Sequence, residues 1–131
     1  MCRVLVVSDN ENIIDFLSLS LVDVSKKLDF TDNIHDAFDR VKKERPDLVI
    51  VSVMIKEEKG SELCRKIRLL RNFTQPFIIF ISTINDDEIE IESLDSGADD
   101  FLNYPINKQL FSKKINLIVK RIYNIKLKIS A

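Results

Sequence analysis

Residues 45–54 read RPDLVIVSVM, and the unbroken apolar run inside this stretch decides the fold. A strand with one face in water alternates apolar and polar side chains. The run from Leu48 to Val53 does not alternate, and Ser52 is its one polar residue. Continuous runs are typical of strands covered on both faces, as in a parallel sheet between two layers of helices. We therefore expect a central strand that ends near Ser52.

Segments on either side of this run predict the rest of an α/β fold. Further strands are expected at Val4 to Val7, Leu28 to Thr31, Phe77 to Ile81 and Phe101-Leu102. Between them, apolar residues recur at helical spacing: Ile13, Ile14, Leu17 and Leu21; Ile34, Ala37, Phe38 and Val41; Leu63, Ile67 and Leu70. Asn33 is placed to cap the second helix, and a last helix begins near Asn107. The alternation predicts a flavodoxin-like, doubly wound (βα)5 domain with a five-stranded parallel sheet of order 2-1-3-4-5.

This topology predicts where the functional site lies. In open α/β sheets, chemistry sits outside the carboxyl ends of the strands where the strand order reverses. Here that point lies between the first and third strands, at Ser8, Asp9 and Asn10 and at Ser52, Val53 and Met54. Residues 7–11 contain no glycine, so a phosphate cradle for a dinucleotide or flavin is not expected.

Composition restricts the class of protein. The 131 residues, 45% hydrophobic and 31% charged, suffice for one domain, and two glycines and three prolines exclude a mainly disordered chain. Twenty basic and twenty-one acidic residues give a net charge of −1, which provides no general attraction for nucleic acid. Cys2 and Cys64 form neither a zinc motif nor a disulfide framework. Because the sequence has no signal-peptide pattern and no apolar run of about 18 residues, we expect a cytoplasmic protein without membrane contact.

Five segments in order resemble the receiver domain of bacterial two-component response regulators, and the resemblance covers nearly the whole chain. They are residues 3–10 (RVLVVSDN), 45–54 (RPDLVIVSVM), 60–68 (GSELCRKIR), 76–82 (PFIIFIS) and 97–106 (GADDFLNYPI). The last is similar to the family's Gly-Ala-Asp-Asp-aromatic strand, which ends in Lys-Pro-aromatic. The resemblance implies a cis peptide bond between Tyr104 and Pro105.

The resemblance also implies a set of site residues. The family has two acids after the first strand, a phosphoacceptor aspartate ending the third, a hydroxyl ending the fourth and a lysine ending the fifth. The corresponding residues here are Ser8, Asp9, Ser52, Ser82 and Tyr104. Three of the five family residue types are lost, at Ser8, Ser52 and Tyr104, so we expect a degenerate pseudo-receiver.

Each loss removes a different part of phosphoryl transfer. Ser52 has no carboxylate from which to make an acyl phosphate, and no histidine is expected beside it to activate the hydroxyl. Asp9 alone is too little charge for Mg²⁺, so we expect weak or no metal binding, no cofactor and no active catalytic residue. Ser8, Ser52, Ser82 and Tyr104 can instead form a neutral hydroxyl cluster around Asp9. Glu57 and Glu58 are near enough to supply a substitute acid, although a solvated charged loop explains them more simply.

Charge segregates near the C-terminus. Residues 86–100 carry eight acids and no base, whereas residues 101–131 carry seven bases and no acid. In the expected fold these segments are neighbours on the face through which receivers usually dimerise, and a twofold axis sets acid against base twice. We expect a homodimer through the fourth helix, fifth strand and fifth helix, with these interface residues: Asp99, Asp100, Phe101, Lys114, Ile118, Lys120, Arg121 and Ile122.

Isoleucines in the last helix continue beyond the expected end of the domain. Phe111, Ile115, Ile118, Ile122, Ile125 and Ile129 follow a heptad-like spacing. Packing on the core accounts for Phe111 to Ile122 and leaves Ile125, Leu127 and Ile129 exposed on a monomer. We expect a receiver-like domain over residues 1–122 and a helical extension over 123–131 that links to a following domain.

Together these patterns predict a non-enzymatic receiver domain of a two-component phosphorelay that acts as a phosphorylation-independent module for protein interaction and dimerisation. Its partner is a protein, either an output domain or another signalling protein, and the domain itself does not contact nucleic acid. Two alternatives stay open: phosphorylation at an unusual residue such as Ser52, and sensing of a small ligand by the altered pocket.

Overall fold

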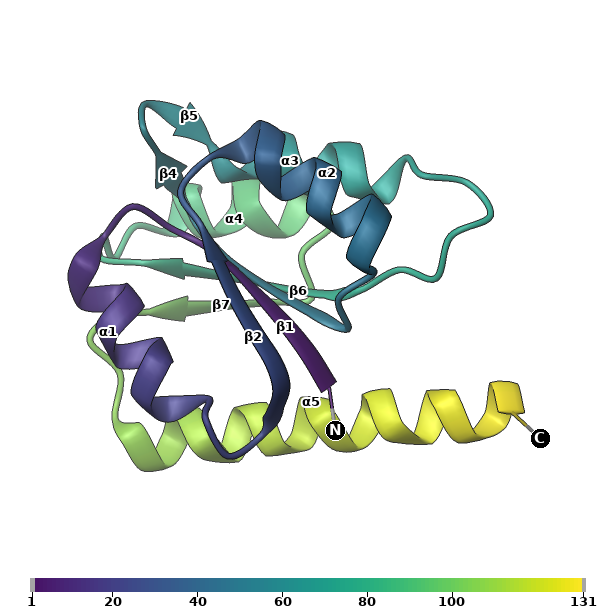
Figure 1. Ribbon diagram of the computed structural model, residues 1–131. Coiled ribbons are helices and arrows are strands. Elements are labelled where there is room, and N and C mark those ends of the chain that lie inside the picture. The colour runs from purple at the N-terminus through teal and green to yellow at the C-terminus, as the bar shows by residue number, and fades with distance from the viewer. Residues whose placement is uncertain (1, 131) are drawn as a thin grey trace.

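The computed structural model describes residues 2–130, which form a parallel sheet between two layers of helices (Figure 1). The main sheet contains five strands in the order β2-β1-β3-β6-β7, and all four strand pairs are parallel. Its strands are β1 (Cys2–Val7), β2 (Ser25–Thr31), β3 (Leu48–Ser52), β6 (Phe77–Ser82) and β7 (Asp100–Asn103). Since β6 and β7 are its fourth and fifth strands along the chain, the predicted doubly wound order is confirmed.

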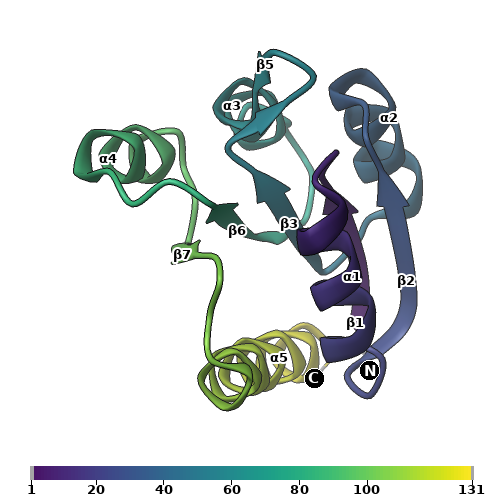
Figure 2. The ribbon, with the colours of Figure 1, turned by 90° about the vertical axis from the view of Figure 1, so that its left-hand side faces the viewer.

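Five helices cover the two faces of this sheet: α1 (Glu11–Ser20), α2 (Ile34–Glu44), α3 (Gly60–Arg68), α4 (Asp87–Asp95) and α5 (Lys108–Ser130). Figure 2 shows α1 and α5 on one face and α2, α3 and α4 on the other. Successive strand residues point to opposite faces, so β3 sends Leu48 and Ile50 to the α1/α5 side and Val49 and Val51 to the α2/α3 side. This two-sided burial explains why the strand has no apolar-polar alternation.

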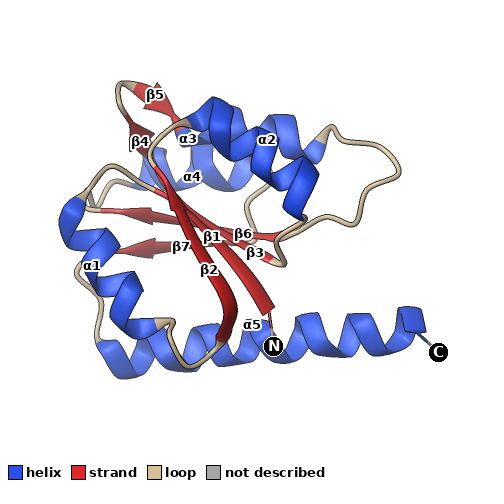
Figure 3. Ribbon diagram, in the orientation of Figure 1, coloured by secondary structure: helices blue, strands red, loops and turns tan. Residues whose placement is uncertain are grey.

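Three of the helices begin at Asn or Asp residues that cap their first turn. The Asn33 side chain accepts a hydrogen bond from the backbone N–H of Asp36 at 2.9 Å, which confirms the predicted cap of α2. Asn10 caps α1 in the same way, and Asp86 accepts the N–H groups of Glu88 and Ile89 at the start of α4. The two caps after β1 and β6 therefore stand at the carboxyl edge of the sheet (Figure 3).

A small two-stranded antiparallel ribbon lies between β3 and α3, where the sequence predicted only a loop. Its strands are β4 (Met54–Ile55) and β5 (Glu58–Lys59), joined by Lys56 and Glu57 with positive φ values of 47° and 69°. Gly60, the residue after β5, has no room for a side chain because a Cβ would meet the carbonyl oxygen of Ser52. The chain can therefore return close to the end of β3.

Helix α5 runs unbroken past residue 122, the expected domain boundary. Ile118 and Ile122, which were predicted to form an interface, are 8% and 6% exposed and belong to the core beneath the sheet. Beyond them Ile125 and Ile129 are 45% and 71% exposed, as the core-packing interpretation predicted. Lys126 braces this part of the helix, because its Nζ lies 2.9 Å from Oδ1 of Asp47 at the start of β3. Within residues 2–130, no helix is both long and apolar enough to span a membrane.

We predict that both cysteines resist alkylation in the folded protein. Cys2 and Cys64 are buried, and desolvation by burial raises the pKa of each thiol, so the reactive thiolate is scarce near neutral pH. Iodoacetamide at pH 7.5 should leave the native mass unchanged, whereas the denatured chain should gain two adducts. Rapid modification of Cys64 in the native protein would contradict this packing, because Cys64 lies within the core between α3 and the sheet.

Candidate functional site

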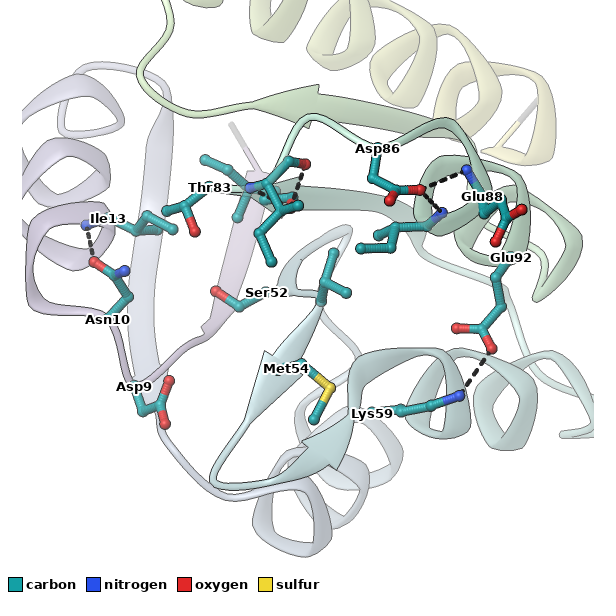
Figure 4. Close-up of a pocket in the computed structure, with 15 residues that line it drawn as sticks. Asp9, Asn10, Ile13, Ser52, Met54, Lys59, Thr83, Asp86, Glu88 and Glu92 are labelled. Carbon is teal, nitrogen blue, oxygen red and sulfur yellow. Dashed lines mark hydrogen bonds and ion pairs between the residues drawn. The ribbon is translucent and has the colours of Figure 1, made fainter.

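A cavity of about 480 Å³ opens at the carboxyl edge of the sheet, at the location that the topology predicted (Figure 4). Side chains from the ends of β1, β3 and β6 form its base, and those from the β5 end and the first turns of α4 form its far wall. The cavity is lined by Asp9, Asn10, Ile13, Ser52, Val53, Met54, Lys59, Ile81, Ser82, Thr83, Ile84, Asp86, Glu88, Ile89 and Glu92.

Ser8 and Ser52 form a buried hydrogen-bonded pair beside this cavity. The Ser52 hydroxyl donates to Oγ of Ser8 at 2.7 Å, and Ser8 Oγ also accepts the backbone N–H of Asn10 at 3.1 Å. Ser52 is 5% exposed and Ser8 is 2% exposed. Neighbouring parallel strands hold them together, since β1 and β3 pair in register and end side by side. Both hydroxyls are neutral, so the pair needs no counter-ion. Ionised side chains buried at the same two positions would need one.

Asp9 lies apart from the serine pair. It is exposed, and its Oδ2 accepts the backbone N–H of Lys56 at 2.9 Å, which ties the β4–β5 turn to the end of β1. The hydrogen bond thus directs this carboxylate to the ribbon and not to a hydroxyl cluster.

Ser82 and Tyr104 also have partners other than the serine pair. The Ser82 hydroxyl closes a local turn with the backbone of Ile84, donating to its carbonyl and accepting its N–H, both at 3.0 Å. The Tyr104 ring packs edge-on against Phe16 with centroids 5.5 Å apart, and Tyr104 does not line the cavity. The Tyr104-Pro105 bond is cis, as the resemblance implied. The structure thus joins Ser8 with Ser52 and leaves Met54, 46% exposed, at the cavity mouth.

Four charged residues of the cavity were missed as site residues by the sequence reasoning. Lys59 lies at the end of β5, Asp86 is the N-cap of α4, and Glu88 and Glu92 lie on its first two turns. Lys59 Nζ is 3.2 Å from Oε2 of Glu92, and this hydrogen bond lowers the pKa of Glu92 against the opposing effect of burial. For the three acids the sequence held a signal, because the acidic run follows the fourth strand and so begins at the same edge of the sheet.

The carboxylates of the cavity do not form a magnesium site. Figure 4 shows Asp9 at one side of the cavity and the Lys59–Glu92 pair at the other. Within residues 2–130, no three His, Cys, Asp or Glu side chains lie close enough to hold one ion. Magnesium requires several oxygen ligands in one octahedral shell, so these residues do not fit the ion that the family resemblance implies.

Glu57 and Glu58, the substitute acids weighed from the sequence, do not line the cavity. Glu57 is exposed in the β4–β5 turn. Glu58 points to α2, where its Oε1 lies 3.8 Å from Nε2 of His35. The ribbon turns both side chains away from Ser52, which agrees with their interpretation as a solvated loop.

The predicted interface residues fall into three groups. Asp99 is used within its own chain, accepting from Arg68 at 2.9 Å and from the N–H of Ile78 at 2.8 Å. Asp100 and Lys114 lie 4.0 Å apart as an ion pair of one chain. Three further residues are buried, namely Phe101, Ile118 and Ile122. The last two, Lys120 and Arg121, are exposed.

The fold and the site together define an α/β domain whose polar cavity lies at the carboxyl ends of parallel strands. The family model described as "Response regulator receiver domain" matches residues 4–116. The chain therefore belongs to the response regulator receiver domain family, and two-component signalling is its functional context.

Individual relatives support this membership. The chain is 31% identical to the response regulator ArlR of Staphylococcus aureus over 121 residues, covering 92% of this chain and 54% of that protein. It thus spans about half the length of this relative. A two-component response regulator from Clostridium difficile superimposes with a TM-score of 0.81 at 25% identity, covering 93% and 98% of the two chains. The receiver domain of a putative LuxO repressor from Vibrio parahaemolyticus shares the fold, with a TM-score of 0.83 at 21% identity and coverage of 96% and 95%.

Proposed function

We propose that this receiver domain is a pseudo-receiver, which takes part in two-component signalling through protein contacts and without phosphorylation. The observation that carries the proposal is the buried Ser52–Ser8 hydrogen bond at the end of β3. Phosphoryl transfer to an aspartate needs a carboxylate nucleophile there, together with a metal ion beside it. A hydroxyl engaged with a second hydroxyl provides neither, so the domain acts by binding and not as an enzyme.

Two further observations support the same function. Asp9 stands alone at its side of the cavity with Oδ2 bonded to the Lys56 N–H, and the acids of α4 stand across the cavity from it, so Mg²⁺ is bound weakly or not at all. Lys59, the cation that lines the cavity, is paired with Glu92 and is not free to meet a phosphoryl group. In this proposal the protein is cytoplasmic, and this domain uses no cofactor and makes no direct contact with nucleic acid.

The proposal predicts that a phosphodonor leaves the protein unchanged. Incubation with acetyl phosphate and Mg²⁺, followed by intact-mass measurement, should show no adduct, because Ser52 has no adjacent base to activate its hydroxyl. An aspartate-bearing receiver treated in parallel is the positive control. A stoichiometric phosphate adduct that disappears in the Ser52→Ala variant would establish the alternative, an unusual phosphoacceptor.

The protein contact that we propose is a homodimer through α4, β7 and α5. Exposed apolar side chains lie on both helices: Ile91, Leu94, Leu110 and Leu117 are 57%, 41%, 50% and 48% exposed. On α5, Leu110, Lys114, Leu117 and Arg121 share one stripe at helical spacing, and α4 carries the acids. Leu117 and Leu110 therefore replace Ile118 and Ile122 as the apolar contacts of the proposed interface, while charge sets the register.

A further inference from the structure

We propose that the cavity at the carboxyl edge of the sheet binds a linear aliphatic diamine, with one ammonium group at each end and the methylene chain between. The cavity is lined by four carboxylates against one ammonium group. Its volume of about 480 Å³ lies in the range of small-molecule sites. This inference goes beyond the proposed function, since it concerns a ligand and not the fate of Ser52.

Carboxylates stand at two opposite ends of the cavity. Asp9 follows β1 at one end, where it is exposed and the Lys56 N–H bonds only its Oδ2. Asp86 and Glu88 stand at the other end, on the first turn of α4, and both are exposed. Figure 4 places Asp9 and Glu88 on opposite sides, with Ser52 between them. A single small ion cannot contact both ends.

Apolar side chains separate these two charged ends. Ile13 and Ile81 are core residues, 2% and 1% exposed, that line the cavity. Val53 lines it as well. Met54 and Ile84 stand at the mouth with 46% and 55% of their surface exposed. A methylene chain removes such surface from water, and the hydroxyl oxygens nearby can accept from an ammonium group.

Charge selects against other classes of ligand. Anions are repelled by the carboxylates, and a divalent metal ion finds no convergent ligand set among residues 2–130. Lys59 is the one cation among the described lining residues, and it neutralises Glu92, which Ser61 also contacts at 3.3 Å. Asp9 and Glu88 then supply negative charge for a bound cation at the two ends, and Asp86 adds to it while its Oδ1 caps α4. An ammonium group at each end of an apolar chain matches this distribution.

The test is a titration of the ¹⁵N-labelled chain with α,ω-diaminoalkanes of four to eight carbons at constant ionic strength. The amides of Asn10 and Ile84 should shift, and affinity should pass through an optimum in chain length. At that length the diamine should bind at least about fivefold more tightly than the n-alkylamine of equal length, compared at equal total charge. Affinity that is independent of chain length, or equal for monoamine and diamine, would show diffuse attraction and overturn the proposal.

Matched charge variants locate the two ends. Asp9→Asn keeps an acceptor for the Lys56 N–H, and it and Glu88→Gln should each weaken diamine binding about fivefold. Glu90→Gln removes the same charge from the same helix at a residue outside the lining and should leave the affinity unchanged. Equal losses in Glu88→Gln and Glu90→Gln would overturn the proposal. The titration uses unmodified protein, so a phosphate adduct on Ser52 would contradict the proposed function and leave this result intact.

Discussion

The Ile118→Glu variant is expected to lose about 4 kcal/mol of unfolding free energy, enough to unfold a domain of ordinary stability at modest temperature. Ile118 is 8% exposed and packs in the core between α5 and the sheet. The substitution removes an apolar side chain from that core and places an unpaired carboxylate there. The expected fall in melting temperature is about 15 °C.

Leu117→Glu is the matched control, because it introduces the same carboxylate one residue away on a half-exposed side chain. Its unfolding free energy should change by no more than about 0.5 kcal/mol. Under the proposed dimer it should weaken self-association in sedimentation velocity, since Leu117 lies on the stripe facing the partner. A folded, stable Ile118→Glu variant would contradict the packing of α5, and a Leu117→Glu variant that dimerises like the parent would remove the interface.

The Ser8→Asp, Ser52→Asp double variant is expected to bind magnesium more tightly than the parent does. The two hydroxyl oxygens are 2.7 Å apart, so two carboxylates at these positions share one small volume. Their repulsion raises the pKa of one carboxyl in the folded state above its unfolded value near 4. The folded variant then holds more protons than the unfolded chain, so without metal its stability falls as the pH rises through that raised pKa.

Magnesium should reverse this loss. At a Mg²⁺ concentration one hundred times its Kd, binding stabilises the folded variant by about 2.7 kcal/mol, whereas the parent's melting temperature should not move. Thermal unfolding with and without Mg²⁺ at pH 7.5 measures the effect, and Ca²⁺ tests its geometry. Phosphorylation should still fail, because Tyr104 packs on Phe16 and no lysine replaces it. A double variant that is indifferent to Mg²⁺ would show that Ser8 and Ser52 are not the metal positions.

The fold was predictable because its signals are local and redundant. The continuous run at Leu48, the cap at Asn33 and the stripe from Ile34 to Val41 each indicate an element independently. The β4–β5 ribbon was not predictable, since strands of two residues carry no periodicity. Ile118 and Ile122 were assigned to an interface because core stripes and heptad seams have the same spacing. Only the position of the sheet shows which surface these residues meet.

The candidate site was predictable where the backbone alone places the side chain. Ser8 directly follows β1 and Ser52 ends β3, and these strands pair in register, so the proximity of the two serines follows from the topology. Asp9 and Tyr104 lie in the loops after β1 and β7, where competing partners decide the direction of the side chain: Asp9 accepts the Lys56 N–H, and Tyr104 packs on the Phe16 ring. Lys59 enters the cavity through the unforeseen ribbon, so its contribution could not be inferred without the structure.

Helix α5 has a mechanical consequence. Its 23 residues form a rod of about 34 Å, and the sheet supports it only as far as Ile122. A tilt of about 5° near Ile115 would displace the far end by about 2 Å, a movement large enough to break a packed contact. The Lys126–Asp47 ion pair acts as a strut against that tilt. Removing this ion pair should loosen the far end of the helix, so the contact between Lys126 and Asp47 at the amino edge of the sheet helps to set the direction in which the domain points its last helix.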